Sequence, residues 1–286
     1  MRQVSMYAET FADVYNSCLA GISDAMKAAR FSAELHNLTG ENADYEILAR
    51  TSDLYLIPPQ KSKLTDIVRG GLTRKDLKDL YEINLVGQRQ PARHHYDKIL
   101  LSPPYKKCPY CSLGQATTLD HYLPKSRFPQ FSVAVANLVP SCKDCQSKKG
   151  RDYAVNKGTQ TLHPYFDPPA FFRESWLRAR VLPVPGASVE FYVDPPVIWS
   201  APMKLRVHAH FKAHQLSKRF AIEAACELES VNQSVSDLRA MGYFSDIEAL
   251  LKIQAKGHAS NCVNSWQSAF YAALSGDTWY CTTPAI

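Results

Sequence analysis

Residues 108–150, CPYCSLGQATTLDHYLPKSRFPQFSVAVANLVPSCKDCQSKKG, decide how the chain is interpreted. They hold two Cys-x-x-Cys pairs, Cys108/Cys111 and Cys142/Cys145. Each pair can turn both sulfurs toward one point, and four thiolates arranged in this way suit a tetrahedral zinc ion. A single pair could also be a redox motif, but two matched pairs favour structural zinc.

The segment between the two pairs predicts a β-hairpin. Residues 117–122 are a short β-prone run, Pro124 and Pro129 break the chain, and residues 131–139 form a second apolar segment that we expect to be extended. The second cysteine pair then opens a short basic helix. The sequence therefore predicts strand, loop, strand and helix, tied together by zinc.

Two parts of this stretch resemble the HNH endonucleases, in particular their zinc-stapled bacterial branch. They are LDHYLPKSRFP at residues 119–129 and NLVPSCKDCQSKKG at residues 137–150. The resemblance covers residues 96–165, and the segments at 162–167 and 264–281 also look like one subfamily of bacterial HNH proteins. It implies an α+β fold, a mainly helical chain around a ββα-metal nuclease core stapled by a four-cysteine zinc site.

The resemblance also implies roles for individual residues. His121 would be the general base, and Asp120 would be a ligand of a catalytic Mg²⁺ or Mn²⁺. Asn137 would hydrogen-bond the hairpin loop and hold His121 in position. Asp120 and His121 are neighbours on a predicted strand, so their side chains leave opposite sides of the backbone and cannot share one task.

The position after the last cysteine departs from the family pattern. Many members carry Asn or His there as a second metal ligand, whereas this chain has Gln146. The Gln146 amide oxygen could still bind the ion, but its longer side chain reaches differently, and Mg²⁺ tolerates misplaced ligands poorly. His163 is the candidate substitute; the alternative is that His163 is structural.

Positive charge gathers around the predicted zinc module. Residues 61–107 carry 11 basic and 5 acidic residues, and residues 123–157 carry 7 basic and 2 acidic ones, in a chain of net charge +6. This distribution is typical of proteins that bind a phosphate backbone. The candidates for phosphate contacts are Lys125, Arg127, Lys148, Lys149 and Arg151. Such contacts position DNA without reading its sequence.

We expect three regions along the chain. Residues 1–95 form a helical N-terminal region, 96–165 the nuclease core, and 166–286 a mostly helical C-terminal region with a short β segment. Within them we expect helices at 9–35, at 43–50 and at 203–228, and strands between 176 and 199. No run of about 18 apolar residues exists, so no membrane span is expected, and the N-terminus lacks a hydrophobic signal core, which predicts a cytoplasmic protein.

Two classes of function remain open from the sequence. The leading hypothesis is a metal-dependent HNH endonuclease that cuts DNA, and the resemblance implies a setting in restriction or anti-phage defence beside a regulatory ATPase or sensor protein. The alternative is a catalytically inactive zinc-binding scaffold that binds nucleic acid. A nuclease acting on RNA or single-stranded DNA is also open, because a site that grips one phosphate does not need two strands.

Overall fold

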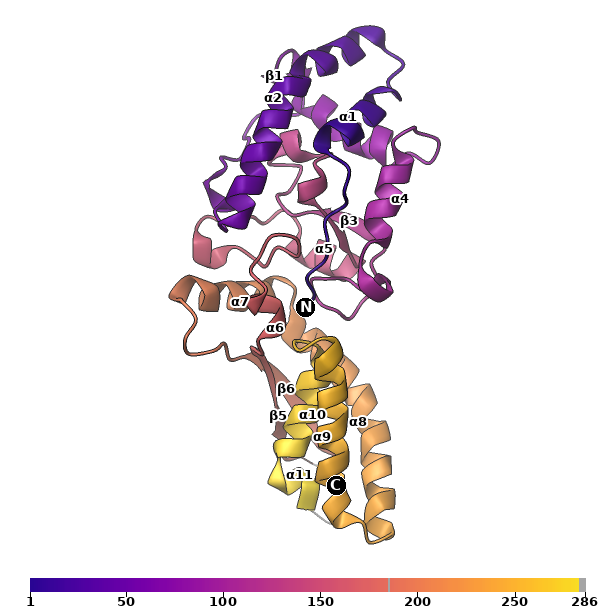
Figure 1. Cartoon of the computed structure of the whole chain (residues 1–286), viewed down its shortest axis with the longest axis vertical. Helices are drawn as coiled ribbons and strands as arrows, with labels where there is room; N and C mark the ends of the chain where they lie inside the picture. Colours follow the sequence, from indigo (N-terminus) through magenta and orange to yellow (C-terminus); the bar gives the residue numbers. More distant parts are fainter. Residues whose placement is uncertain (185, 283–286) are drawn as a thin grey trace. The chain divides into compact units, whose positions relative to one another are not determined.

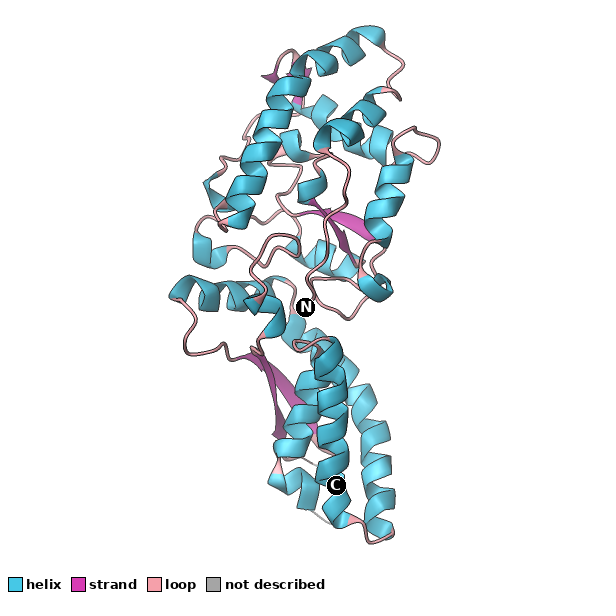
Figure 2. Ribbon diagram, in the orientation of Figure 1, coloured by secondary structure: helices cyan, strands magenta, loops and turns pink. Residues whose placement is uncertain are grey.

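The computed structural model describes residues 1–184 and 186–282, and it confirms an α+β chain in which helices predominate (Figures 1 and 2). Within the described residues, the named strands form three two-stranded antiparallel sheets. None of the helices in this part of the chain combines the length and the hydropathy that a bilayer span requires.

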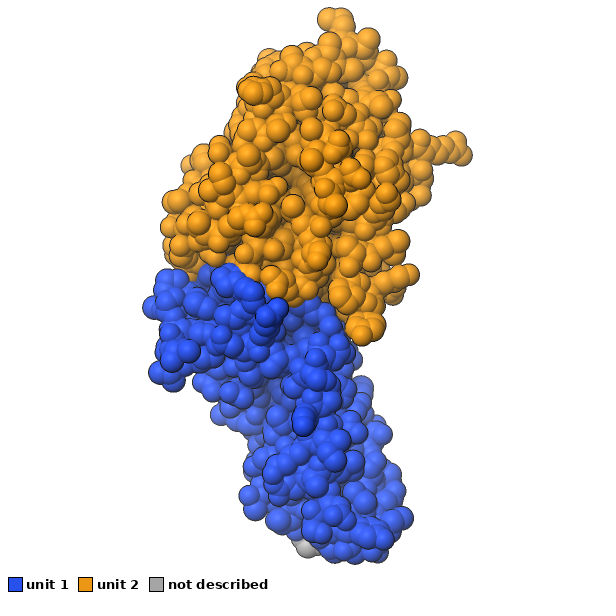
Figure 3. All heavy atoms as spheres, viewed as in Figure 1, with its two compact units in different colours: residues 1–2, 111–113, 168–286 blue, residues 3–110, 114–167 orange. Residues whose placement is uncertain are grey.

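The chain divides into two compact units (Figure 3). Unit 2 contains residues 3–110 and 114–167, and unit 1 contains residues 1–2, 111–113 and 168–286. The hydrophobic core of unit 2 draws residues from both expected regions, 1–95 and 96–165.

Most helices of unit 2 precede the cysteine stretch. The elements of this part are α1 (Phe11–Leu19), α2 (Ala25–Arg50), β1 (Ile67–Arg69), β2 (Leu72–Thr73), α3 (Arg74–Asp79), a π-helical segment (Leu80–Leu85) and α4 (Arg93–Leu101). Helix α1 begins with a capping box in which Thr10 and Asp13 bind each other's backbone. The helix expected at 9–35 is interrupted at residues 20–24, between α1 and α2.

Helix α2 is longer than the sequence pattern indicates. We expected separate helices at 9–35 and 43–50, but one helix continues from Ala25 through Gly40 to Arg50. Leu38, Tyr45 and Ala49 are buried along one face, and this packing holds the helix together. Gly40 lies where an added Cβ would meet open space, so it takes no part in this packing.

The cysteine stretch forms a hairpin followed by a helix. Strand β3 (Thr118–His121) pairs antiparallel with β4 (Leu138–Ser141), so that Asp120 lies opposite Val139, and α5 (Lys143–Lys149) follows. The expected extended segment at 131–139 is wrong in its first part. Residues Pro129–Phe131 and Val135–Asn137 are 3-10 turns, because the Asn137 side chain binds the backbone of Phe131 and folds the chain back.

Unit 1 packs a hairpin against helices. Its elements are α6 (Ala170–Arg173), β5 (Leu177–Leu182), β6 (Ser188–Val193), α7 (Ala201–Ala213), α8 (Leu216–Ala240), α9 (Phe244–Asn261), α10 (Trp266–Gly276) and α11 (Thr278–Thr282). The expected strands are confirmed by β5 and β6. The single helix expected at 203–228 is wrong: α7 ends at Ala213, and Gln215, whose φ of +49° is left-handed, interrupts the helix before α8 begins.

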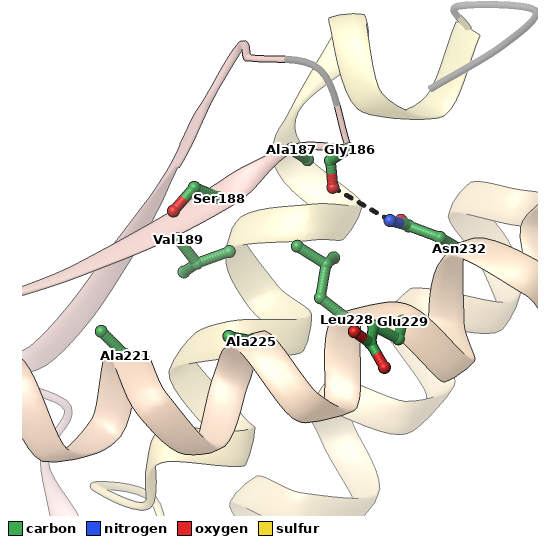
Figure 4. Close-up of a pocket in the computed structure, with 9 residues that line it drawn as sticks. All are labelled: Gly186, Ala187, Ser188, Val189, Ala221, Ala225, Leu228, Glu229 and Asn232. Atoms are coloured by element: carbon green, nitrogen blue, oxygen red, sulfur yellow. Dashed lines mark hydrogen bonds between the residues drawn. The ribbon is translucent and has the colours of Figure 1, made fainter.

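A pocket of about 320 Å³ lies in unit 1 between β6 and α8 (Figure 4). Its walls are mostly small or apolar, with Ala221, Ala225 and Leu228 on the helix side. Glu229 is its one charged lining residue among those described, and Asn232 is bonded to the Gly186 carbonyl. This pocket therefore lacks the grouped acids and bases that a hydrolytic site needs.

The side chain of Asn264 ties unit 1 together at the start of β5. Its Oδ1 accepts from the backbone N–H groups of Trp176 and Leu177 at 3.0 and 3.1 Å. Its Nδ2 donates to the carbonyls of Phe171 and Glu174 at 3.3 and 2.9 Å. One fully buried amide thus satisfies four backbone groups of a segment that is neither helix nor strand.

We predict that Asn264→Leu lowers the free energy of unfolding of unit 1 by about 2–3 kcal/mol, because it leaves buried backbone groups unpaired. All four tryptophans lie in residues 168–286, so urea denaturation followed by tryptophan fluorescence reports on this unit. Gln254→Leu, on an exposed position of α9, is the matched control and should change little. Equal effects of the two substitutions would contradict the prediction.

Candidate metal centre and active pocket

The four cysteines of the two Cys-x-x-Cys pairs come together. Their sulfurs all lie within 4.8 Å of one another, and all four residues are buried. Zinc–sulfur bonds of about 2.3 Å place tetrahedral sulfurs about 3.8 Å apart, so this cluster could hold a structural zinc ion. It is the one group of three or more Cys, His, Asp or Glu side chains with metal-binding spacing in the part of the chain that the structure describes.

Backbone groups favour thiolates in this cluster. The N–H of Leu113 donates to Cys111 Sγ, and the N–H of Cys145 donates to Cys142 Sγ, each at 3.4 Å. Donors directed at sulfur stabilise its negative charge, and a metal ion needs that deprotonated form.

Gly114 lets the first pair approach the second. A Cβ at this position would lie 2.8 Å from Cys142 Cβ and 3.0 Å from Cys142 Sγ. The carbonyl of Gly114 also accepts from the N–H of Cys108 at 2.9 Å, which closes the loop around the first pair. No larger residue fits there without moving a cysteine.

Asp120 and His121, which are neighbours on β3, have different contact partners. Asp120 is buried, and its Oδ2 accepts from the Tyr110 hydroxyl at 3.2 Å and pairs with Lys149 Nζ at 3.0 Å. Burial raises the pKa of Asp120, while Lys149 and Tyr110 oppose that rise. Tyr110 stands between Cys108 and Cys111, so a residue inside the first Cys-x-x-Cys segment holds this carboxylate.

The imidazole of His121 is fixed by a different set of partners. Its Nε2 lies 2.8 Å from the carbonyl oxygen of Ser132, and the Tyr81 ring meets it edge to face at 4.4 Å. A carbonyl only accepts, so Nε2 carries the proton of the neutral ring and Nδ1 keeps the lone pair. Burial, with Lys125 and Lys149 nearby, lowers the pKa of His121 to about 3, so the ring is neutral at pH 7.

One pocket of unit 2 brings several of the expected residues together. It has a volume of about 280 Å³. Its lining consists of Lys78, Tyr81, Glu82, Leu119, Asp120, His121, Pro124, Lys125, Ser126, Gln146, Gly150 and Arg151. The candidate base, both candidate oxygen ligands and two of the expected phosphate-binding residues therefore share this pocket.

Gln146 lies across the pocket on α5. Its Nε2 donates to the Leu119 carbonyl at 3.1 Å, which fixes the side chain beside β3. Because the amide nitrogen makes that bond, the amide oxygen Oε1 is the atom of Gln146 that could bind a cation.

His163 does not line the pocket. It is fully buried, its Nε2 lies 3.3 Å from the Tyr45 hydroxyl, and its Nδ1 accepts from the Tyr165 N–H. The ring also packs 4.2 Å from that of Tyr122. These contacts are those of a structural histidine.

Asn137 organises the loop between the strands. Its Oδ1 accepts from the Leu123 N–H at 2.7 Å, and its Nδ2 donates to the carbonyls of Leu123 and Phe131. The same turn carries Ser132, whose carbonyl binds His121. Asn137 thus fixes the segment that orients the imidazole.

The five basic candidates are placed differently. Lys125 and Arg151 line the pocket, and Arg127 and Lys148 are exposed. Lys149 was expected to contact phosphate, but it turns inward: its Nζ binds Asp120 and donates to the His121 carbonyl at 2.6 Å. The sequence pattern did not indicate this, because a lysine in a basic helix usually faces solvent.

Sequence reasoning missed Tyr81 and Glu82 as pocket residues. Glu82 pairs with Lys125 at 3.2 Å, and the Lys125 ammonium lies 4.4 Å above the Tyr81 ring. Both Tyr81 and Glu82 come from the π-helical segment Leu80–Leu85. π-Helical turns often occur at functional sites, but no sequence pattern marked this one.

We predict that Gly114→Ala weakens zinc retention and lowers the melting temperature, because the added methyl group displaces Cys142. The measurements are zinc content per chain and the rate of zinc loss to a chelator. Gly40→Ala is the matched control: its Cβ meets open space, and alanine should stabilise α2 by about 0.8–1 kcal/mol. Wild-type zinc retention by Gly114→Ala would contradict the prediction.

Comparison with known proteins gives a relation that extends over nearly the whole chain. Protein Ea31 of Escherichia phage lambda is 32% identical over 288 residues, which cover 96% of this chain and 97% of Ea31. A shorter similarity links the chain to the Septu protein PtuB of Bacillus thuringiensis, with 34% identity over 76 residues, 25% of this chain and 29% of PtuB.

The other comparisons returned no match: no family model matches the chain, and no solved structure matches it. The relation to Ea31 spans both units, so it concerns the complete described fold and not only the cysteine stretch. By this relation, the chain belongs to the family of the phage lambda protein Ea31.

Proposed function

We propose that this protein is a metal-dependent endonuclease of the HNH type that hydrolyses phosphodiester bonds in DNA. The observation that carries the proposal is the placement of His121, a neutral imidazole oriented by the Ser132 carbonyl in a pocket that also holds Asp120 and Gln146. The consecutive elements β3, β4 and α5 supply the frame, which we interpret as a ββα-metal core.

His121 would act as the general base. Nδ1 takes a proton from a water molecule as the water oxygen attacks phosphorus, and the bond to the 3′ oxygen breaks, leaving a 5′-phosphate end. The Ser132 carbonyl holds the Nε2 proton during this transfer and stabilises the imidazolium that forms. Tyr81 packs against the ring and limits its rotation.

The oxygen donors in the pocket fit a hard divalent cation. A carboxylate from Asp120 and the amide oxygen of Gln146 are ligand types that Mg²⁺ and Mn²⁺ accept, and both residues line the same pocket as His121. When bound, such an ion supplies neutralisation of the phosphate charge and of the departing oxygen.

The remaining basic groups would bind the nucleic acid backbone. Lys125 and Arg151 line the pocket, and exposed Arg127 and Lys148 extend the positive charge beyond it. Lysine and arginine contacts of this kind give affinity for phosphates without base readout. We therefore propose DNA as the substrate class and no intrinsic preference for a base sequence.

The similarity to a Septu protein, together with the HNH resemblance, leads us to propose a role in anti-phage defence or restriction. A regulatory ATPase or sensor as partner, and a cytoplasmic location, stay predictions. The alternative is an inactive zinc-binding scaffold, whose biological effect would not depend on His121. Substitution of His121 therefore distinguishes the nuclease from the scaffold.

We predict that His121→Ala lowers the rate of plasmid cleavage by about 10²- to 10⁴-fold, the usual contribution of a general base, while DNA affinity is kept. Cleavage is measured on supercoiled plasmid with Mg²⁺ and with Mn²⁺, with single-stranded DNA and RNA as parallel substrates. His94→Ala, an exposed histidine of α4 outside the pocket, is the matched control and should cleave as wild type.

The outcome on each substrate has a defined meaning. Cleavage of RNA or single-stranded DNA alone would replace duplex DNA as the substrate. Retention of the biological effect by His121→Ala, without cleavage by wild type, would favour the scaffold.

A further inference from the structure

The only carboxylates that line the pocket, among the described residues, are each paired with a lysine. Asp120 is paired with Lys149 at 3.0 Å, and Glu82 with Lys125 at 3.2 Å. Lys78 Nζ lies 3.9 Å from Glu82 as well, and Arg151 adds a further positive charge to the lining. The pocket therefore carries more positive than negative charge.

Lys149 is an internal counter-charge for Asp120. Only 5% of its side chain is exposed, so water screens the pair weakly. Its Nζ is also fixed by the His121 carbonyl, at 2.6 Å. The ammonium cannot withdraw into solvent without breaking that bond, so it stays beside the carboxylate.

This arrangement disfavours a divalent cation by itself. A cation that approaches Asp120 meets a carboxylate whose charge is already balanced, a neutral amide from Gln146, and the ammonium of Lys149 at short range. Repulsion between like charges opposes its entry. A phosphate group has the opposite preference, because its negative charge completes the balance of the basic lining.

We propose that the pocket takes up the divalent cation and the nucleic acid phosphate together, with Lys149 setting their coupling. The inference rests on the proposed nuclease function and adds to it how the binding of the cation and the binding of the phosphate depend on each other. The cation binds weakly to the protein alone, and the phosphate that enters between the cation, Lys125 and Arg151 supplies the missing negative charge. By thermodynamic reciprocity, the cation strengthens DNA binding by the same factor.

The test is a Mn²⁺ titration of zinc-loaded His121→Ala protein, which leaves DNA uncut, with free Mn²⁺ followed by electron paramagnetic resonance. The titration is done without DNA and with a short duplex. The protein that carries both Asp120→Ala and His121→Ala, mixed with the same duplex, gives the Mn²⁺ bound by DNA itself. We expect the duplex to tighten Mn²⁺ binding at the Asp120 site about tenfold or more.

Lys149→Met, added to the same background, separates a charge effect from a structural one. It removes the ammonium and keeps an unbranched side chain, so Mn²⁺ should bind the DNA-free protein more tightly and the coupling factor should fall. A merely structural lysine would give weaker Mn²⁺ binding with and without DNA. Zinc content and circular dichroism check that the variant is folded.

Equal Mn²⁺ affinity with and without the duplex would overturn the inference, as would an unchanged coupling factor in Lys149→Met or no Mn²⁺ binding in either state. Wild-type protein assayed on plasmid in the same buffers keeps the two proposals apart. Cleavage without coupling removes only this inference, whereas no cleavage on any substrate counts against the nuclease.

Discussion

The hydrogen bond and ion pair at Asp120 Oδ2 are the contacts on which the pocket depends. One partner, Tyr110, stands within the first cysteine pair, and the other, Lys149, ends the helix that the second pair begins. Each cysteine pair is therefore connected to the same oxygen atom through one nearby residue, Tyr110 for the first pair and Lys149 for the second. Removing either partner would leave a buried carboxylate less compensated, and such groups are costly.

The rest of the site is built outward from that carboxylate. The strand that carries Asp120 also carries His121, and Leu119, one residue earlier than Asp120, is part of the hydrophobic core shared with the N-terminal helices. The core thus fixes the strand, the strand brings both functional residues to one pocket, and Asn137 closes the loop that orients the imidazole.

The chemical residue types of the site could be predicted from sequence, because they occur in one local stretch with regular spacing. The four cysteines form a cluster, and Asp120, His121 and Gln146 share a pocket. What the sequence could not predict depends on tertiary contacts. Asp120 is contacted by Lys149, 29 positions later in the chain, and by the hydroxyl of Tyr110, 10 positions earlier.

The fold was predictable to a similar extent and for similar reasons. The strands of unit 1 were predicted from a clear alternation of apolar residues. The short basic helix was predicted from the second Cys-x-x-Cys pair, which opens it. The length of α2 was not predicted, because Gly40 is a residue type that often interrupts helices. The burial of Leu38 and Tyr45 stabilises the helix on both sides of it. The turn at Gln215 carries no proline or glycine, so no local signal marked it.

The position of Tyr110 between two cysteines has a consequence for oxidation chemistry. A disulfide between Cys108 and Cys111 would fix their Cβ atoms about 3.8 Å apart and close a covalent ring that contains Tyr110. The hydrogen bond from Tyr110 to Asp120 therefore lies within reach of a change at two sulfur atoms that do not line the pocket. The sulfur chemistry of the cysteine cluster and the oxygen and nitrogen chemistry of the pocket are thus connected through a single phenol group.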